Sequence, residues 1–298
     1  MKKKMLAIAV MFLTGSLFMP DTTFAAWTQQ KGHSYQQLTF SYYSTDERFS
    51  TVRSTVIKEV ETITGLGGTE RESQTKYEAY SLTYYGELGI TDTLTILATV
   101  PWKRFTSKSD TPGTSGIGDI ELGLRYNLSK NLFGSDLLMS LQGIVKIPEA
   151  YKYGSINLNS SLGEGQYDTT LAVLFGKGFN KGYAWLNVGY NYRFENNKND
   201  PLVFKPSDQV KILIGGGYNI TPLVTLRGFL DWTTSVGNAS LSRELIGSSF
   251  FAVESDALRE HVLIRKNIGL EPSFLNVWVD LVVRITPNMQ AFLRTAGM

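Results

Sequence analysis

The sequence predicts an all-β protein, a transmembrane antiparallel β-barrel of about 12 strands that follows a cleaved signal peptide. Three observations lead to this fold class. Apolar and polar residues alternate with period two, short and long connections take turns, and aromatic residues gather near both ends of the expected strands. A chain of 298 residues is long enough for one large β domain.

Residues 1–25 have the pattern of a secretory signal. Three lysines precede an apolar stretch from Met5 to Met19, and Thr23 and Ala25 provide small residues before a cleavage site. We expect cleavage after Ala25 or Ala26, so that the barrel comprises residues 26–298. An N-terminal membrane anchor is the alternative, but polar residues and a proline interrupt a stretch already shorter than the ~20 residues of a spanning helix.

Strict alternation marks the strands that follow. Between residues 119 and 128, Ile120, Leu122 and Leu124 share one face with further apolar residues, and Asp119 and Glu121 lie on the other. Such segments are about ten residues long, as a tilted membrane strand requires. Strands are expected at 35–44, 77–88, 94–102, 117–128, 137–147, 166–176, 183–194, 208–218, 223–232, 261–270, 275–285 and 289–297.

Alternation alone fits both a membrane barrel, with its apolar face outward, and a soluble sandwich, with that face inward. Short turns such as 89–93 and 219–222 alternate with long stretches such as 45–76 and 233–260, which is the periplasmic and extracellular rhythm of outer-membrane barrels. Aromatic residues on the apolar face follow the same rhythm and predict two girdles. The outward-running strands end in Trp102, Tyr192 and Trp232, and the returning strands end in Tyr84, Tyr126, Phe175 and Tyr218.

The end of the chain fits this scheme less well. Twelve strands place both chain ends in the periplasm and make Thr286-Pro287-Asn288 an extracellular turn, although it resembles the periplasmic turn at Thr221-Pro222. Merging residues 267–285 into one strand leaves eleven strands instead.

Several segments together resemble the phenol meta-pathway-like outer-membrane transporters, most closely over residues 80–232. They are Gly89-Ile90-Thr91-Asp92-Thr93-Leu94, Val100-Pro101-Trp102, the run from Gly116 to Tyr126, Lys146-Ile147-Pro148 and the run from Gly163 to Asp168. The resemblance implies a Gram-negative outer-membrane barrel that admits small, often aromatic or apolar compounds, and it brings no defined ligand residues. The chain departs from the pattern at Met298, where such barrels usually end in an aromatic residue.

Composition argues against other classes of function. The chain contains no Cys, which excludes disulfides, thiolate metal sites and a Cys nucleophile. The formal charge of +2 comes from the first 25 residues, and the neutral remainder predicts no nucleic-acid partner. His33 and His261 have no local partners with the spacing of a triad or a metal pair. We therefore expect no enzyme activity, no cofactor and no metal.

Polar residues on the inward faces are the candidate functional residues. The lumen-lining candidates are Asp119, Glu121, Arg125, Lys146, Asp168, Arg193, Lys211, Arg227 and Asp231. Simple antiparallel register brings Asp119 and Glu121 near Lys146, Lys146 near Asp168, and Arg193 near Lys211 and Asp231. These charges either line a constriction that orients a solute or pair with one another to fill a narrow lumen.

The barrel pattern thus predicts a passive outer-membrane channel for small molecules, and the resemblance implies that these are aromatic or hydrophobic compounds. Its expected partners are outer-membrane lipid, small-molecule solutes and the barrel assembly machinery. One alternative is a structural barrel with a closed lumen, whose loops 45–76 and 233–260 bind a surface partner. The other is a soluble periplasmic β-protein.

Overall fold

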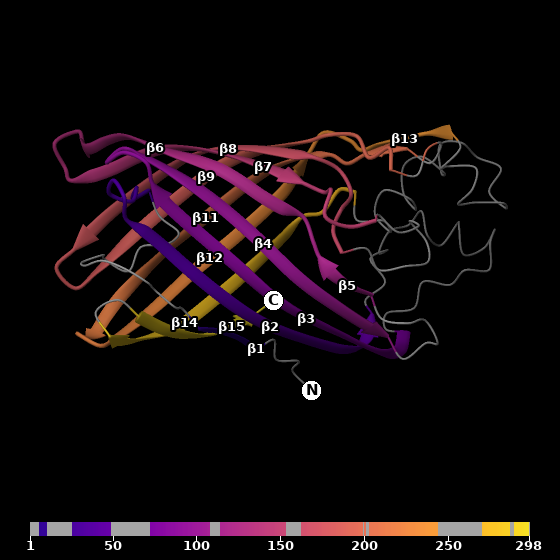
Figure 1. Cartoon of the computed structure of the whole chain (residues 1–298), viewed down its shortest axis with the longest axis horizontal. Coiled ribbons are helices and arrows are strands. Elements are labelled where there is room, and N and C mark those ends of the chain that lie inside the picture. Colours follow the sequence, from indigo (N-terminus) through magenta and orange to yellow (C-terminus); the bar gives the residue numbers. More distant parts are fainter. Residues whose placement is uncertain are drawn as a thin grey trace, which may run out of the picture.

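The chain winds into one closed, tilted barrel (Figure 1). The computed structural model describes residues 6–10, 26–48, 72–107, 114–152, 162–198, 200, 203–243, 270–286 and 289–297. The wall strands are β1 (Leu6–Val10), β2 (Ser34–Arg48), β3 (Glu72–Gly89), β4 (Leu94–Ser107), β6 (Ile120–Leu132), β7 (Leu137–Ile147), β8 (Asp168–Phe179), β9 (Gly182–Arg193), β11 (Asp208–Thr221), β12 (Val224–Val236), β14 (Phe274–Thr286) and β15 (Met289–Gly297).

Every pairing in the wall is antiparallel. Strand β3 pairs with both β2 and β4, and β1 joins β2 to β15, so the ring has no free edge among the described strands. The short strand β5 (Thr114–Ile117) pairs with the part of β4 that lies beyond the residues of β4 paired with β6. Strands β10 (Phe204–Lys205) and β13 (Ser240–Leu241) form a separate two-stranded sheet.

The predicted fold class is confirmed, and eleven of the twelve expected segments coincide with wall strands. Residues 261–269 of the segment expected at 261–270 lie outside the described residues, and Leu270 is not in a strand. The twelfth position in the ring belongs to β1, which lies within the predicted signal peptide. Cleavage of residues 1–25 stays a prediction.

Connections between strands alternate in length around the barrel. Short turns follow β3, β6, β8, β11 and β14 at one end, and long connections follow β2, β4, β7, β9 and β12 at the other. In Figure 1 the short turns gather at the left, and the strand ends that lead into the long connections lie at the right. We call these ends the short-turn end and the long-loop end.

The expected position of the last turn is wrong. Strands β12 and β14 pair directly, so the chain returns to the short-turn end at Thr286. There the Arg284 backbone N–H donates to the Leu223 carbonyl at 2.8 Å. Strand β15 therefore runs toward the long-loop end, and the two chain ends do not both lie at the periplasmic end as expected.

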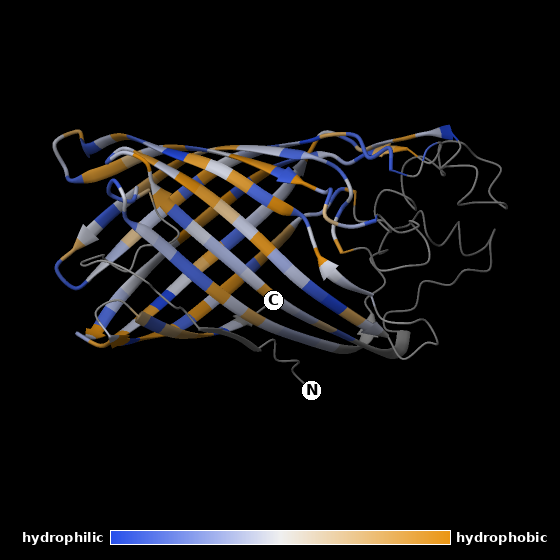
Figure 2. Ribbon diagram, viewed as in Figure 1, coloured by the Kyte–Doolittle hydropathy of each residue, from blue (hydrophilic) through white to orange (hydrophobic). Residues whose placement is uncertain are grey.

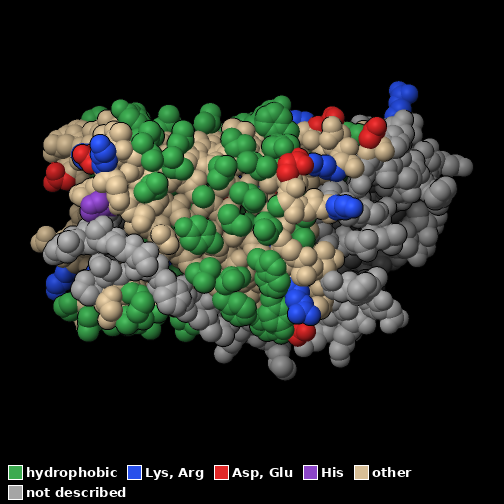
Figure 3. All heavy atoms as spheres, in the orientation of Figure 1, with side chains coloured by type: hydrophobic (Ala, Val, Ile, Leu, Met, Phe, Trp, Pro, Cys, Tyr) green, Lys and Arg blue, Asp and Glu red, His purple; other side chains and the backbone are tan. Residues whose placement is uncertain are grey.

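Apolar side chains face outward. On β6 the side chains of Leu122 and Leu124 are 47% and 53% exposed, whereas Arg125 between exposed neighbours is buried. Figure 2 shows the alternation along each strand, and Figure 3 shows apolar side chains covering the wall between charged ends. An exposed apolar belt of this size excludes the soluble alternative, whose apolar face would point inward.

The two aromatic girdles are present on this belt. Trp102, Tyr192 and Trp232 are exposed near the long-loop end, and Tyr84, Tyr126 and Tyr218 near the short-turn end. No helix within the described part of the chain is long and apolar enough to span a membrane.

Replacing Leu124 with Arg tests the outward orientation. Because Leu124 lies midway along the exposed face of β6, a cation there should cost about 2–4 kcal/mol of folding free energy in a bilayer. The control is Leu128→Arg on the same face but close to the short turn, where the cost should fall to about 0–1 kcal/mol. Urea titration of the barrel refolded in vesicles measures the loss of folding free energy in each variant. Equal losses at the two positions would contradict the placement of Leu124 deeper in the bilayer than Leu128.

Candidate functional site inside the barrel

The nine candidate residues take inward positions, and eight of them lie on wall strands, with Asp119 just before β6. Each is buried or half-buried, and all but Asp119 and Lys211 have at least one exposed apolar neighbour in the sequence. Most of them belong to ion-pair clusters at three places in the interior.

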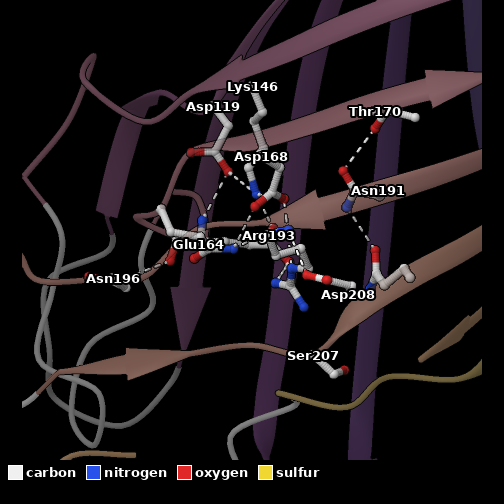
Figure 4. Close-up of polar contacts among 12 residues, drawn as sticks. Asp119, Lys146, Glu164, Asp168, Thr170, Asn191, Arg193, Asn196, Ser207 and Asp208 are labelled. Carbon is white, nitrogen blue, oxygen red and sulfur yellow. Dashed lines mark hydrogen bonds and ion pairs between the residues drawn. The ribbon is translucent and has the colours of Figure 1, made fainter. Parts of the chain in front are cut away.

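The outer cluster lies at the long-loop end and consists of Asp119, Lys146, Glu164, Asp168 and Arg193 (Figure 4). Lys146 Nζ is 2.6 Å from Asp168 Oδ2 and 3.9 Å from Asp119 Oδ2, and it also contacts Glu164. Arg193 Nη2 donates to Glu164 Oε1 at 3.0 Å, and its Nε is 3.7 Å from Asp168. Glu121 lies opposite Lys146 in the β6–β7 register.

Glu164 comes from the connection between β7 and β8, not from a strand. Its backbone N–H donates to Asp119 at 2.9 Å, its carbonyl accepts from Asn196 at 2.9 Å, and the next N–H, of Gly165, donates to the Tyr151 hydroxyl at 2.9 Å. The segment 162–166 is thus fastened to the rim of the barrel through its backbone.

Charge neighbours keep Glu164 ionised. Burial by itself would raise the pKa of this carboxyl, but the Lys146 and Arg193 charges outweigh that effect and lower its pKa to about 2. The stabilisation from these ion pairs is complete above the ordinary pKa of a glutamate and is lost as the pH falls through about 2.

Lys211 lies close enough to Asp231 to act on its charge, but the register separates Arg193 from Lys211 more than simple pairing predicts. The β9–β11 pairing sets Lys211 opposite Gly189, two residue pairs deeper than Gln209 opposite Asn191. Arg193 therefore lies level with the start of β11, where its backbone N–H donates to Asp208 Oδ1 at 3.0 Å.

The inner cluster consists of Glu87 and Arg125 and lies at the short-turn end. It is hydrogen-bonded to the segment 26–30, which precedes β2. The segment 26–30 enters the barrel at this end, with Ala26 and Gln29 buried and Gln30 exposed. The Gln29 side chain donates to Glu87 at 2.6 Å, and its backbone N–H donates to Thr95 at 2.8 Å. Arg125, 3.1 Å from Glu87, donates to the Trp27 carbonyl at 2.8 Å. The inserted segment is thus hydrogen-bonded on several sides.

Aromatic side chains continue from Trp27 across the inner wall. Successive ring centroids are 6.4, 5.7, 6.2 and 6.1 Å apart along Trp27, Tyr183, Trp185, Phe229 and Trp278. These are distances at which aromatic pairs attract. We call these five residues the aromatic strip.

Glycines on β11 make room for the strip. A Cβ at Gly215 would lie 2.6 Å from Trp185, and one at Gly217 would lie 2.6 Å from Tyr183. Gly176 on β8 likewise lies under Trp27, which a Cβ would approach to 2.8 Å. Side chains at these three positions would collide with the rings, so the glycines are part of the strip's construction.

The third cluster is a carboxylate between two arginines. Asp280 on β14 is fully buried and accepts from Arg227 Nε at 2.8 Å and from Arg294 Nε at 2.7 Å. Arg294 also lies 4.9 Å from the Phe229 ring centroid and 5.4 Å from that of Trp278. The cluster therefore borders the aromatic strip.

The sequence analysis missed two kinds of residue. Glu87, Asp280 and Arg294 take inward positions on strands, and the period of two could have found them. Glu164 and Trp27 lie outside the strands, where no periodicity exists. Among the described residues no group of three or more metal-ligating side chains occurs, and His261 lies outside them.

No protein-family model matches the chain, and no curated protein matches it by sequence. An outer membrane channel from Pseudomonas putida F1 has a similar solved structure, with 14% identity, a TM-score of 0.55, and coverage of 99% of this chain and 94% of that one. The P. putida toluene transporter TodX matches with 10% identity and a TM-score of 0.40 over 99% and 86% of the two chains. The first likeness and the exposed apolar belt show the fold of an outer-membrane β-barrel.

Proposed function

We propose that this protein is an outer-membrane channel that admits small aromatic or hydrophobic compounds, as its resemblance to the phenol meta-pathway-like transporters implies. The aromatic strip is the observation that carries the proposal. The interior of a membrane barrel is ordinarily polar, because it holds water. The five rings form a row in which each lies close to the next, and glycines on β8 and β11 leave room for them. They give the interior an apolar lining that a solute meets once the segment 26–30 has moved.

The inserted segment 26–30 acts as the closure of this channel. Its Trp27 packs against Tyr183 of the strip, and the segment is hydrogen-bonded to Glu87, Thr95 and Arg125 of the wall. Passage of a solute requires the segment to shift, because its residues and the strip occupy the same part of the interior. The short-turn end then faces the periplasm. The proposed partners of the chain are outer-membrane lipid, which surrounds the apolar wall, and the barrel assembly machinery.

Loosening the segment should increase permeation. In the double variant Trp27→Ala/Gln29→Ala the closure loses its ring contact and a charge-assisted hydrogen bond, and a loss of about 1.5–3 kcal/mol per such bond shifts an open population about tenfold or more. Intact cells that produce the variant should take up the apolar aromatic dye N-phenyl-1-naphthylamine faster than cells with the wild type. Trp102→Ala, on the lipid-facing side, is the matched control and should leave uptake unchanged.

A closed structural barrel is the second candidate. The buried ion pairs Arg125–Glu87 and Arg227–Asp280 favour it, since they fill the interior with mutually neutralised charges. Its proposed binding loops, 45–76 and 233–260, lie largely outside the described residues. Dye uptake that stays at the level of cells lacking the protein, in the wild type and the double variant alike, would favour this candidate over the channel.

A further inference from the structure

We propose that Lys146 and Arg193 form a binding site for the carboxylate of a small solute, and that Glu164 occupies this site when no solute is bound. The inference rests on the proposed channel and names a solute class that the outer cluster selects. Glu164 places one carboxylate oxygen on each cation, as a bound carboxylic acid would.

Arg193 has more donors than Glu164 uses. Its side chain is 3% exposed, and its Nη2 donates a hydrogen bond to Glu164. Nε, which lies 3.7 Å from Asp168, and Nη1 are buried and have no hydrogen-bond partner among the residues that the structure describes. Buried guanidinium N–H groups that lack an acceptor cost folding free energy. A carboxylate that accepts from two neighbouring nitrogens of Arg193 would remove part of that cost. A solute carboxylate can therefore replace Glu164 without a net loss of hydrogen bonds.

Glu164 is the accessible member of the cluster. Its side chain is 52% exposed, whereas those of Lys146 and Asp168 are 11% and 7% exposed. The bonds that fasten segment 162–166 to Asp119, Tyr151 and Asn196 use backbone groups and not the Glu164 carboxylate. The carboxylate can swing away while the segment stays in place, so exchange with a solute requires only a side-chain movement.

Charge balance selects a monoanion. When Glu164 leaves, Lys146 keeps Asp168 at 2.6 Å, but Arg193 keeps only the 3.7 Å contact with the same carboxylate. The vacated position thus lies against an incompletely compensated guanidinium. One carboxylate restores the balance, and a neutral solute of the same shape does not.

Isothermal titration calorimetry of the full-length barrel in detergent tests the site with benzoate and, as its neutral analogue, benzyl alcohol. Benzoate should bind and benzyl alcohol should bind at least about tenfold more weakly, because the charge-assisted bonds are lost. Glu164→Gln removes the charge of the internal competitor and should tighten benzoate binding about tenfold. Arg193→Lys keeps the charge but loses the planar fork, and should weaken binding.

Glu149→Gln is the matched control, because it removes the charge of another loop carboxylate that does not contact Lys146 or Arg193. The Glu149 carboxylate pairs with Lys198, with 2.5 Å between Lys198 Nζ and Glu149 Oε1. It should leave benzoate affinity unchanged. Equal binding of the two ligands, or an unchanged affinity in Glu164→Gln, would overturn the site even if Arg193→Lys failed to fold. Calorimetry needs no bilayer, so dye uptake without benzoate binding rejects this site alone, and benzoate binding without dye uptake rejects the channel alone.

Discussion

Removal of residues 289–298 is expected to abolish the folded barrel. The deletion takes away β15, whose backbone pairs with β14 on one side and with β1 on the other. In lipid the exposed backbone groups of both neighbours would find no water, at a cost of several kcal/mol for each unpaired group. The heat-modifiable band of the folded barrel should disappear from gels.

Deletion of Met298 alone is the control for this truncation, because it leaves β15 whole, and it should fold like the wild type. A barrel that folds fully without residues 289–298 would show that β14 closes against another strand and would contradict the ring described here.

Asp280→Ala is expected to destabilise the barrel by about 3–5 kcal/mol. The substitution removes the carboxylate that Arg227 and Arg294 share in a buried position, and it leaves the two guanidinium groups close together without it. Removal of one partner from a buried ion-pair cluster costs far more than the cluster contributes, because the remaining charges stay desolvated. Urea unfolding of the refolded barrel in vesicles measures the loss.

Two variants show whether charge is the cause. Arg227→Leu/Asp280→Leu/Arg294→Leu removes all three charges and should recover much of the lost stability, since apolar replacement of a whole buried cluster is often neutral. Asp231→Asn alters a half-buried carboxylate on β12 and should cost less than Asp280→Ala. A triple variant as unstable as Asp280→Ala would point to packing instead of charge.

Much of the wall could be predicted because each strand has lipid on one side. Ile120, Leu122 and Leu124 must be apolar for that reason, and the resulting period of two locates β6 to within a few residues. The position of Thr286 could not be predicted the same way. The sequence of a long connection can contain or resemble a strand, so strand counting from the sequence does not determine the direction of β14. That direction follows from the antiparallel pairing of β14 with β12.

The interior was predictable only where it is built from strands. Register arithmetic brought Lys146 beside Asp168, and the structure places them 2.6 Å apart. The same arithmetic misplaced Arg193 relative to Lys211 although β9 and β11 begin within one residue of their expected positions, because the pairing register sets Lys211 opposite Gly189. Glu164 and Trp27 reach the interior from non-repetitive chain, and nothing in their local sequence separates them from solvent-facing residues.

The position of β1 has a consequence for the geometry of an exported chain. Strands β2 and β15 each run antiparallel to β1, so they run parallel to each other. If residues 1–25 are removed, these two strands become neighbours across the seam, and the barrel has eleven strands with one parallel pair. Such odd-numbered barrels exist, and the loss of one strand from the circumference narrows the radius by about 1 Å. Cleavage of the leader would then tighten the wall around the aromatic strip.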